Sequence, residues 1–155
     1  MIKRLLISAL ALFSCFVSAQ NNSQYVNVFI GTDGTGHTFP GPSLPFGMVQ
    51  PGPDNKDKDW AYTSGYQFRD TTILGFSQTH LSGTGIGELG DILLLPFVES
   101  KDESFKNTLL KNTEKASVGY YTVTKKDNVK VELTASERVA FHRYTSWSLW
   151  DMPDP

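Results

Sequence analysis

The chain has 155 residues, a length that suits one domain, and its formal net charge of -2 leaves no basic face of the kind that binds nucleic acid. Glycine is unevenly spread, because 12 of the 13 glycines lie between positions 31 and 90. This distribution disfavours a helical bundle and favours an all-β or loop-rich body.

Residues 1–19 have the layout of a secretory signal peptide. Lys3 and Arg4 precede an apolar core, and Ala19 ends a small-residue cleavage site. The apolar core is too short to span a bilayer comfortably, so we predict no transmembrane helix. We expect an exported protein that begins at Gln20 and resides in the periplasm, at the cell surface or outside the cell.

An alternative for the same segment is a lipoprotein signal with Cys15 as the lipidated residue. Phe13 is bulky for that motif, and the residues after Cys15 stay apolar. Cleavage after Ala19 would leave a mature chain without cysteine, and therefore without a disulfide or a thiol nucleophile.

The first part of the mature chain predicts short strands around a long loop. Residues 25–30 and 47–51 predict strands, and residues 31–46 between them are rich in glycine and proline. No glycine-lysine-serine/threonine pattern and no helix-forming run follows these glycines, which excludes a phosphate-binding loop. His37 lies in this loop and could share a site with His80 only if their two loops meet.

A charged run and two aromatic residues come next. Residues 54–59 predict a solvated loop and do not match the EF-hand spacing. Trp60 follows with Tyr62, and such rings either plug a core or stack on a sugar. The alternation of Tyr66 and Phe68 with polar residues predicts a further strand.

The stretch 74–96 organises the chain. An apolar run at 73–76 is followed by a polar, glycine-rich loop and a second apolar run at 92–95. This pattern predicts two buried strands that hold a loop between them, a common way to present a binding surface. The candidate loop or interface residues are His80, Ser82, Gly83, Gly85, Glu88 and Asp91.

No catalytic residue and no metal ligand can be assigned from this loop. Glu88 and Asp91 are paired carboxylates of the kind that perform acid–base chemistry, but they are only three positions apart. Asp91 equally fits a turn-capping role before the second apolar run. Ser82 lacks the surroundings of a nucleophile elbow.

The last third carries the clearest strand pattern. Residues 99–115 predict a polar surface excursion with at most one helical turn near 108–110. Strands are predicted at 118–125, 129–135 and 138–142, and the second alternates with a period of two. Strands in antiparallel series predict an all-β fold, an antiparallel β-sandwich.

Four ordered segments cover most of residues 25–145: VNVFIGTDGTGHTFPGPSLPFGMVQPGPD, SGYQFRDTTILGFSQTHLSGTGIGELGDILLLP, GYYTV and VELTASERVAFHRYT. Together they resemble the N-terminal domain of glycoside hydrolase family 92, the calcium-dependent exo-acting α-mannosidases. Gln78 stands where the family usually has histidine, and Val118 stands where proline is common.

The resemblance implies a two-domain enzyme in which a β-sandwich packs on an (α/α)6 barrel. It implies an inverting mechanism, with the catalytic acid, the catalytic base and the calcium ligands on the barrel, beyond this chain. It also implies that Trp60 reaches the rim of the active site, near mannose-containing glycans. The loop around His80 is then expected to face the barrel or the pocket rim.

The expected organisation is a signal peptide at 1–19, a partial sandwich domain at 20–145 and an atypical tail at 146–155. We therefore interpret the chain as a fragment of an α-1,2-class mannosidase that is itself inactive and binds no calcium. The alternative is a stand-alone carbohydrate-binding β-sandwich.

Overall fold

The computed structural model of this chain describes residues 21–55, 59–83, 85–87, 89–99 and 102–146. The predicted signal peptide, Glu88 and the tail after Ser146 lie outside these residues. Ser146, the first residue of the tail predicted at 146–155, ends the last strand.

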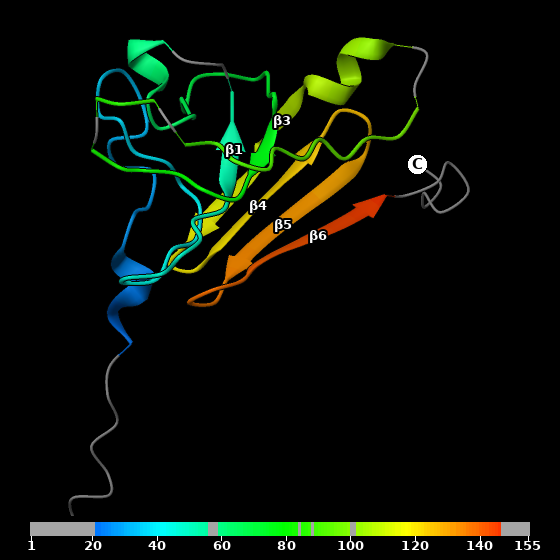
Figure 1. Cartoon of the computed structure of the whole chain (residues 1–155). Coiled ribbons are helices and arrows are strands. Elements are labelled where there is room, and N and C mark those ends of the chain that lie inside the picture. The colour runs from blue at the N-terminus through cyan, green and yellow to red at the C-terminus, as the bar shows by residue number, and fades with distance from the viewer. Residues whose placement is uncertain (1–20, 56–58, 84, 88, 100–101, 147–155) are drawn as a thin grey trace, which may run out of the picture.

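A four-stranded antiparallel sheet forms the larger layer (Figure 1). Its strands pair in sequence order, β3-β4-β5-β6, so each connection is a hairpin. Gly119, with a φ of 80°, supplies the left-handed position in the turn between β3 and β4. Asn128, with a φ of 63°, supplies it in the turn between β4 and β5. The strands are β3 (Leu109–Ser117), β4 (Tyr120–Lys125), β5 (Val129–Ala135) and β6 (Ala140–Ser146).

The smaller layer is a pair of three-residue strands, β1 (Gly52–Asp54) and β2 (Gly75–Ser77), which pair antiparallel. Ile73 and Phe76 from this region belong to one buried cluster with apolar side chains of the sheet. The apolar positions predicted to face the core in β5 do so, because Val131 and Leu133 are fully buried, although Glu132 between them is buried as well. The sheet contributes Leu109, Tyr121, Val123, Val129, Val131 and Leu133.

Two antiparallel layers therefore enclose a single core, and the predicted all-β sandwich class is confirmed. The remaining elements of the described chain are short 3-10 helices: η2 (Asn22–Tyr25), η3 (Trp60–Tyr62) and η4 (Glu103–Asn107). None of the helices in the described ranges is long and apolar enough to cross a membrane.

The strand predicted at 25–30 is wrong. The chain forms η2 and then turns, because asparagine side chains bind nearby backbone amides: Ser23 N donates to Asn21 Oδ1 at 3.1 Å, and Phe29 N donates to Asn27 Oδ1 at 3.0 Å. Such local bonds compete with a strand ladder.

The strands predicted at 47–51 and around Tyr66 are also wrong. Their backbone amides bind separate loops instead of one neighbouring strand: Met48 N donates to Glu137 O, and Phe68 N donates to Thr32 O. These segments are irregular connections, with a bend at Met48 and a turn at Phe68.

The helical turn expected near 108–110 lies just upstream as η4, and β3 begins at Leu109. The pairing of β3 with β4 shifts register between Leu110 and Lys115, which marks a β-bulge. Glu114 lies within this irregular part, and its side chain is only 1% exposed.

Glu132 on β5 should make the fold sensitive to acid. Hydrogen bonds from Arg143 and Tyr120 lower its pKa to about 2, from 4.5. The stability that this carboxylate contributes is present above pH 4.5 and is lost as the pH falls toward 2. Because Arg143 is largely exposed and its charge is screened by solvent, we expect the Glu132 carboxylate to contribute about 1–2 kcal/mol to the free energy of unfolding.

Acid unfolding followed by circular dichroism tests this expectation. At neutral pH, Glu132→Gln should be less stable than the unchanged protein by that same amount. Between pH 4.5 and 2, its free energy of unfolding should fall less than that of the unchanged protein. An identical acid profile in the two proteins would contradict it.

Candidate functional site

His80 lies under the central loop as a buried anchor. It is 3% exposed, and its ring stacks on Phe39 with centroids 4.6 Å apart. Its Nδ1 lies 2.8 Å from the Gln50 carbonyl, and its Nε2 lies 3.2 Å from Asp54 Oδ1 and 3.4 Å from Ser77 Oγ. The ring thus connects the loop to both strands of the small layer.

Asp54, at the end of β1, completes this arrangement. Its Oδ2 accepts a hydrogen bond from the Ser77 amide at 3.0 Å, while its Oδ1 faces His80. A Cβ on Gly65 would lie 2.5 Å from that Oδ1, so glycine at this position makes room for the carboxylate. Both oxygens of Asp54 are therefore committed to structural contacts.

A pocket of about 470 Å³ opens above His80 and Asp54. Its lining combines the buried polar side chains of His80 and Asp54 with exposed leucines, and Asp91 also lines it. The residues that line it are Asp54, Tyr62, Thr63, Ser64, Gly65, Leu74, Thr79, His80, Leu81, Gly87, Leu89, Gly90, Asp91 and Leu93.

Asp91 holds the end of the central loop. Its Oδ2 accepts a bond from Thr79 Oγ1 at 3.1 Å, and its own amide donates to the same hydroxyl at 3.1 Å. The Gln78 amide also donates to the Asp91 carbonyl at 3.0 Å. These bonds close the base of the central loop, so Asp91 has a structural contact there, and the turn-capping and acid–base roles considered for it stay predictions. Glu88, its predicted partner, lies outside the described residues.

The two glycine-rich loops do meet at both histidines, but the two imidazole rings contact other residues. The Gly83 amide donates to the His37 carbonyl at 2.6 Å, whereas the His37 ring contacts Trp60 and the His80 ring contacts Phe39. Ser82 is exposed beside this junction. The shared histidine site considered from sequence is therefore not formed by these contacts.

Trp60 begins η3 and is 61% exposed. Its ring makes an edge contact with His37, with centroids 4.8 Å apart and planes at 86°. A Cβ on Gly85 would lie 2.9 Å from Trp60 Cζ3, so this glycine lies directly against the indole. Trp60 is thus a surface aromatic held by two loops, and it is not among the described residues that line the pocket.

The segment that carries Trp60 is anchored deeply in the fold. Gln67 is 1% exposed, and its side-chain nitrogen Nε2 donates to the backbone carbonyls of Gly34 and Ala61. Tyr62 donates to Asp70 at 2.5 Å. The 3-10 turn of Trp60 is therefore tied to the first glycine-rich loop and to the chain that follows it.

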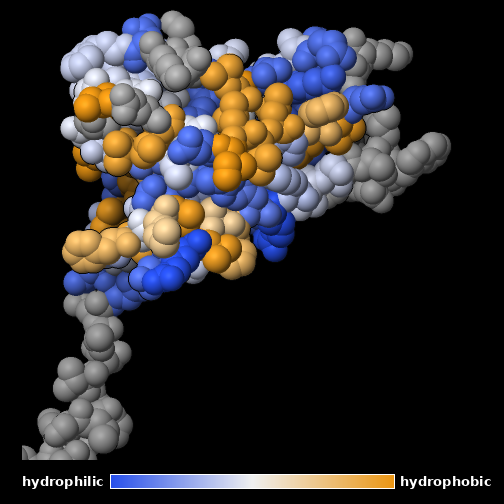
Figure 2. All heavy atoms as spheres, viewed as in Figure 1, coloured by the Kyte–Doolittle hydropathy of each residue, from blue (hydrophilic) through white to orange (hydrophobic). Residues whose placement is uncertain are grey.

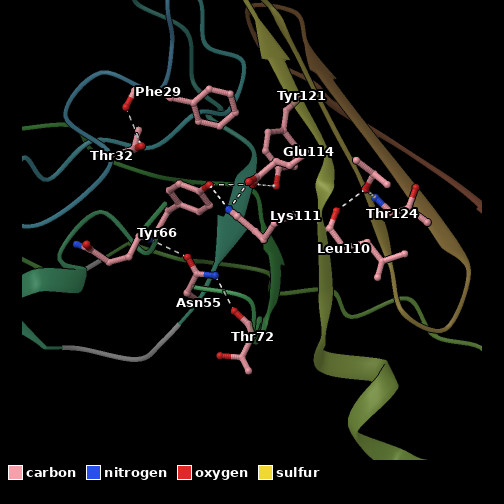
Figure 3. A network of polar contacts seen from close by, with 12 residues as sticks. Phe29, Thr32, Asn55, Tyr66, Thr72, Leu110, Lys111, Glu114, Tyr121 and Thr124 are labelled. Carbon is pink, nitrogen blue, oxygen red and sulfur yellow. Dashed lines mark hydrogen bonds and ion pairs between the residues drawn. The ribbon is translucent and has the colours of Figure 1, made fainter. Parts of the chain in front are cut away.

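Tyr66 fixes the far end of this segment to the sheet. Figure 3 shows Tyr66, Tyr121 and Lys111 converging on the Glu114 carboxylate. The two tyrosine hydroxyls donate to Glu114 Oε1 at 2.8 and 2.7 Å, and Lys111 forms an ion pair with its other oxygen. Burial raises the pKa of Tyr66 and of Tyr121, and the Glu114 charge adds to the effect.

The prediction of two buried strands around the central loop is only half right. β2 is buried, but the second apolar run pairs only through a single bridge, Phe76 with Leu94. Figure 2 shows that apolar side chains gather on this face of the molecule. We call the exposed run the apolar band, which comprises Leu89, Ile92, Leu93, Leu94, Phe97 and Val98.

Ile92 is the most exposed member of the apolar band, at 71%, and its φ is 57°. A β-branched residue rarely adopts a positive φ, so this backbone is strained. An exposed apolar run with a strained centre is typical of a surface that another part of a protein covers.

Within the described ranges, no group of three or more His, Cys, Asp or Glu side chains is placed to hold a metal ion. Of the carboxylates that line the pocket, Asp54 Oδ1 faces His80 and Asp91 Oδ2 accepts the Thr79 hydroxyl. The expectation that this chain binds no calcium stays a prediction.

Sequence comparison places the chain among carbohydrate-active proteins. The family model for the Glycosyl hydrolase family 92 N-terminal domain matches residues 25–147. A protein of Arthroderma benhamiae described as an uncharacterized secreted glycosidase is 30% identical over 131 residues, which are 78% of this chain and 17% of that protein.

Solved structures agree. A family GH92 α-mannosidase of Bacteroides thetaiotaomicron, in complex with mannoimidazole, is 38% identical with a TM-score of 0.73, over 80% of this chain and 18% of its own. An inverting GH92 mannosidase of strain VPI-5482 shares the fold at 20% identity and a TM-score of 0.62, over 84% and 19% of the two chains. The chain therefore spans less than a fifth of these relatives.

Proposed function

Because the chain belongs to glycoside hydrolase family 92, as its N-terminal domain, we propose that it forms the non-catalytic wall of an exo-acting, inverting α-mannosidase. The observation that carries the proposal is the 38% identity and the TM-score of 0.73 to an α-mannosidase over 80% of the chain. The proposed substrates are mannose-containing glycans, of the α-1,2-linked class.

The chemistry of inversion supports a non-catalytic role for this domain. Inverting hydrolysis needs an acid and a base roughly 6.5–9.5 Å apart, with room for water between the base and the sugar. At the described pocket, both oxygens of Asp54 have structural partners, and Asp91 Oδ2 accepts the Thr79 hydroxyl, so both carboxylates already take part in the fold. We place the catalytic pair and the calcium ligands on a barrel domain, in the part of the relatives that this chain does not cover.

The apolar band supports docking onto that catalytic domain. Ile92 and Phe97 are 71% and 53% exposed, which leaves apolar surface that a second domain would remove from water. The pocket beside the band, with Leu89 and Leu93 in its wall, adds a concave element to the same face. The loop of His80 is then the support of the interface, not its contact surface.

Trp60 is proposed to contact the bound glycan. Its exposed indole is held between loops, and aromatic rings stack well on the apolar face of a sugar. The same exposure favours the second candidate, a stand-alone carbohydrate-binding module. Since Trp60 does not line the pocket, one aromatic wall should bind sugar only weakly without a second domain.

An activity measurement separates the two candidates. The 155-residue chain should release no mannose from α-1,2-mannobiose in the presence of calcium, and it should not be retained by mannan. A polypeptide of the relatives' length that includes this chain, called the longer polypeptide below, should hydrolyse α-1,2-mannobiose. Trp60→Ala in the longer polypeptide should raise KM about tenfold or more, because the stacking on the sugar is lost. Tyr25→Ala, at a 76% exposed aromatic, is the matched control.

Calcium-dependent turnover by the 155-residue chain would show that the catalytic groups lie within it, and would overturn this assignment. Saturable retention on mannan without turnover would support the module instead.

Export is proposed from residues 1–19, which lie outside the described residues, and the description of the fungal relative as secreted supports it. The mass of the exported protein should correspond to a chain that begins at Gln20. A lipidated Cys15 at the N-terminus would replace this proposal by the lipoprotein alternative.

A further inference from the structure

We propose that His37 is a positioning residue, which holds the Trp60 indole in one orientation on the surface. The proposal deepens the function given above, and its importance for catalysis rests on the proposed contact between Trp60 and the glycan. The contact between the two rings does not depend on that function, because it is present in the structure of this chain.

The environment of His37 is energetically unfavourable in two respects. His37 is 7% exposed, and its Nε2 has no hydrogen-bond partner among the described residues. Its φ of 53° is a left-handed conformation that non-glycine residues seldom adopt. A buried, unpaired ring nitrogen and a strained backbone both oppose folding, so a compensating contact is expected.

The contact that His37 does make is with Trp60. The ring planes are nearly perpendicular, at 86°, with centroids 4.8 Å apart, which is the favourable edge-to-face geometry for aromatic pairs. The same geometry suits a weak interaction of a ring N–H or C–H with a π face. The backbone of His37 is fixed in turn, because its carbonyl accepts the Gly83 amide at 2.6 Å.

Gly85 closes the other boundary of the indole. A methyl group there would lie 2.9 Å from Cζ3 and 3.1 Å from Cη2 of Trp60. The indole is therefore confined by His37 and by the Gly85 backbone, while most of its surface stays open to a ligand. A ring that is already ordered loses less conformational freedom when it binds, which raises affinity.

A spectroscopic test reports on Trp60 directly. The sequence has three tryptophans, so substituting Trp147 and Trp150 by phenylalanine leaves Trp60 as the single probe for fluorescence anisotropy decay. In that background, His37→Asn should add a fast local motion of the indole, because asparagine tolerates the positive φ but lacks the ring. His37→Phe keeps an aromatic edge and should restore the slow decay.

Two glycines provide a matched pair for the other boundary. Gly85→Ala should displace the indole and change its emission, whereas Gly87→Ala should not, because its nearest neighbour would be Thr63 Cα at 3.8 Å. Circular dichroism of each variant verifies the fold. An unchanged anisotropy decay in a folded His37→Asn protein would overturn the proposal.

Kinetics of the longer polypeptide then separate the two claims. If Trp60 contacts the glycan, His37→Asn should raise KM about threefold to tenfold with little change in kcat, as expected for lost preorganisation. If Trp60→Ala leaves KM unchanged while His37→Asn still loosens the indole, the glycan contact fails and the positioning role stands. A KM unaffected by His37→Asn but raised by Trp60→Ala would show that positioning does not serve binding.

Discussion

Replacing Asp127 by alanine is expected to lower the free energy of unfolding by about 3–5 kcal/mol, the usual cost of removing one partner of a buried ion pair. Asp127 and Lys125 have fully buried side chains, and their charged groups are 2.9 Å apart. Burial lowers the pKa of Lys125, and Asp127 opposes this shift. Without Asp127, the lysine would be left in the interior with no counter-charge.

The same carboxylate holds the end of the apolar band. Asp127 accepts a hydrogen bond from the Val98 amide at 3.2 Å, and Lys125 donates to the Pro96 carbonyl. The pair thus ties the chain that follows the central loop to the turn between β4 and β5. Loss of Asp127 should therefore loosen the proposed docking surface as well as the core.

Urea unfolding followed by circular dichroism measures the loss, since the midpoint reports stability where the slope is unchanged. The control is Lys125→Met with Asp127→Leu, which replaces both charges by apolar groups and should cost much less than the single change. A loss below about 1 kcal/mol in Asp127→Ala would show that water or another group satisfies Lys125.

The parts of the fold with a regular pattern could be predicted from the sequence. β5 alternates strictly, and its turn to β4 contains Asp127 and Asn128, so its position was found correctly. The sequence does not predict β3, because its bulge turns Glu114 inward, to the hydroxyl of Tyr66, which lies 48 positions away, and to that of Tyr121 on the neighbouring strand. A polar residue buried by distant partners leaves no local signal.

The candidate site shows the same limit. The sequence identifies His80 and Trp60 as candidates, but it does not predict that His80 is buried and Trp60 exposed. Ile92 was expected to be buried because an apolar run has the same composition whether it enters a core or an interface. The sequence places His37 in a loop and allows a site shared with His80, whereas its contact with Trp60 accompanies the Gly83 junction between two loops.

The second large effect is expected for His80→Ala, which should lower the free energy of unfolding by about 2–4 kcal/mol. The change removes the ring between Gln50 and Asp54 and the stack on Phe39. Among the described residues, the nearly buried Asp54 carboxylate would then keep the hydrogen bond from the Ser77 amide. Because the ring supports the pocket floor, domain docking and activity of the longer polypeptide should fall together with stability.

His142 offers the matched control, since it is a partly exposed histidine on β6 that contacts Gln78 at 2.9 Å. His142→Ala should cost about 1 kcal/mol or less, because water can replace the contacts of its ring with Gln78 and with the exposed Tyr144 hydroxyl. Thermal unfolding of both variants, with kcat and KM of the longer polypeptide measured well below the melting temperature, separates lost stability from lost docking. An unchanged melting temperature and unchanged kinetics in His80→Ala would rule out the anchoring role, and the density of contacts at this ring would then need another explanation.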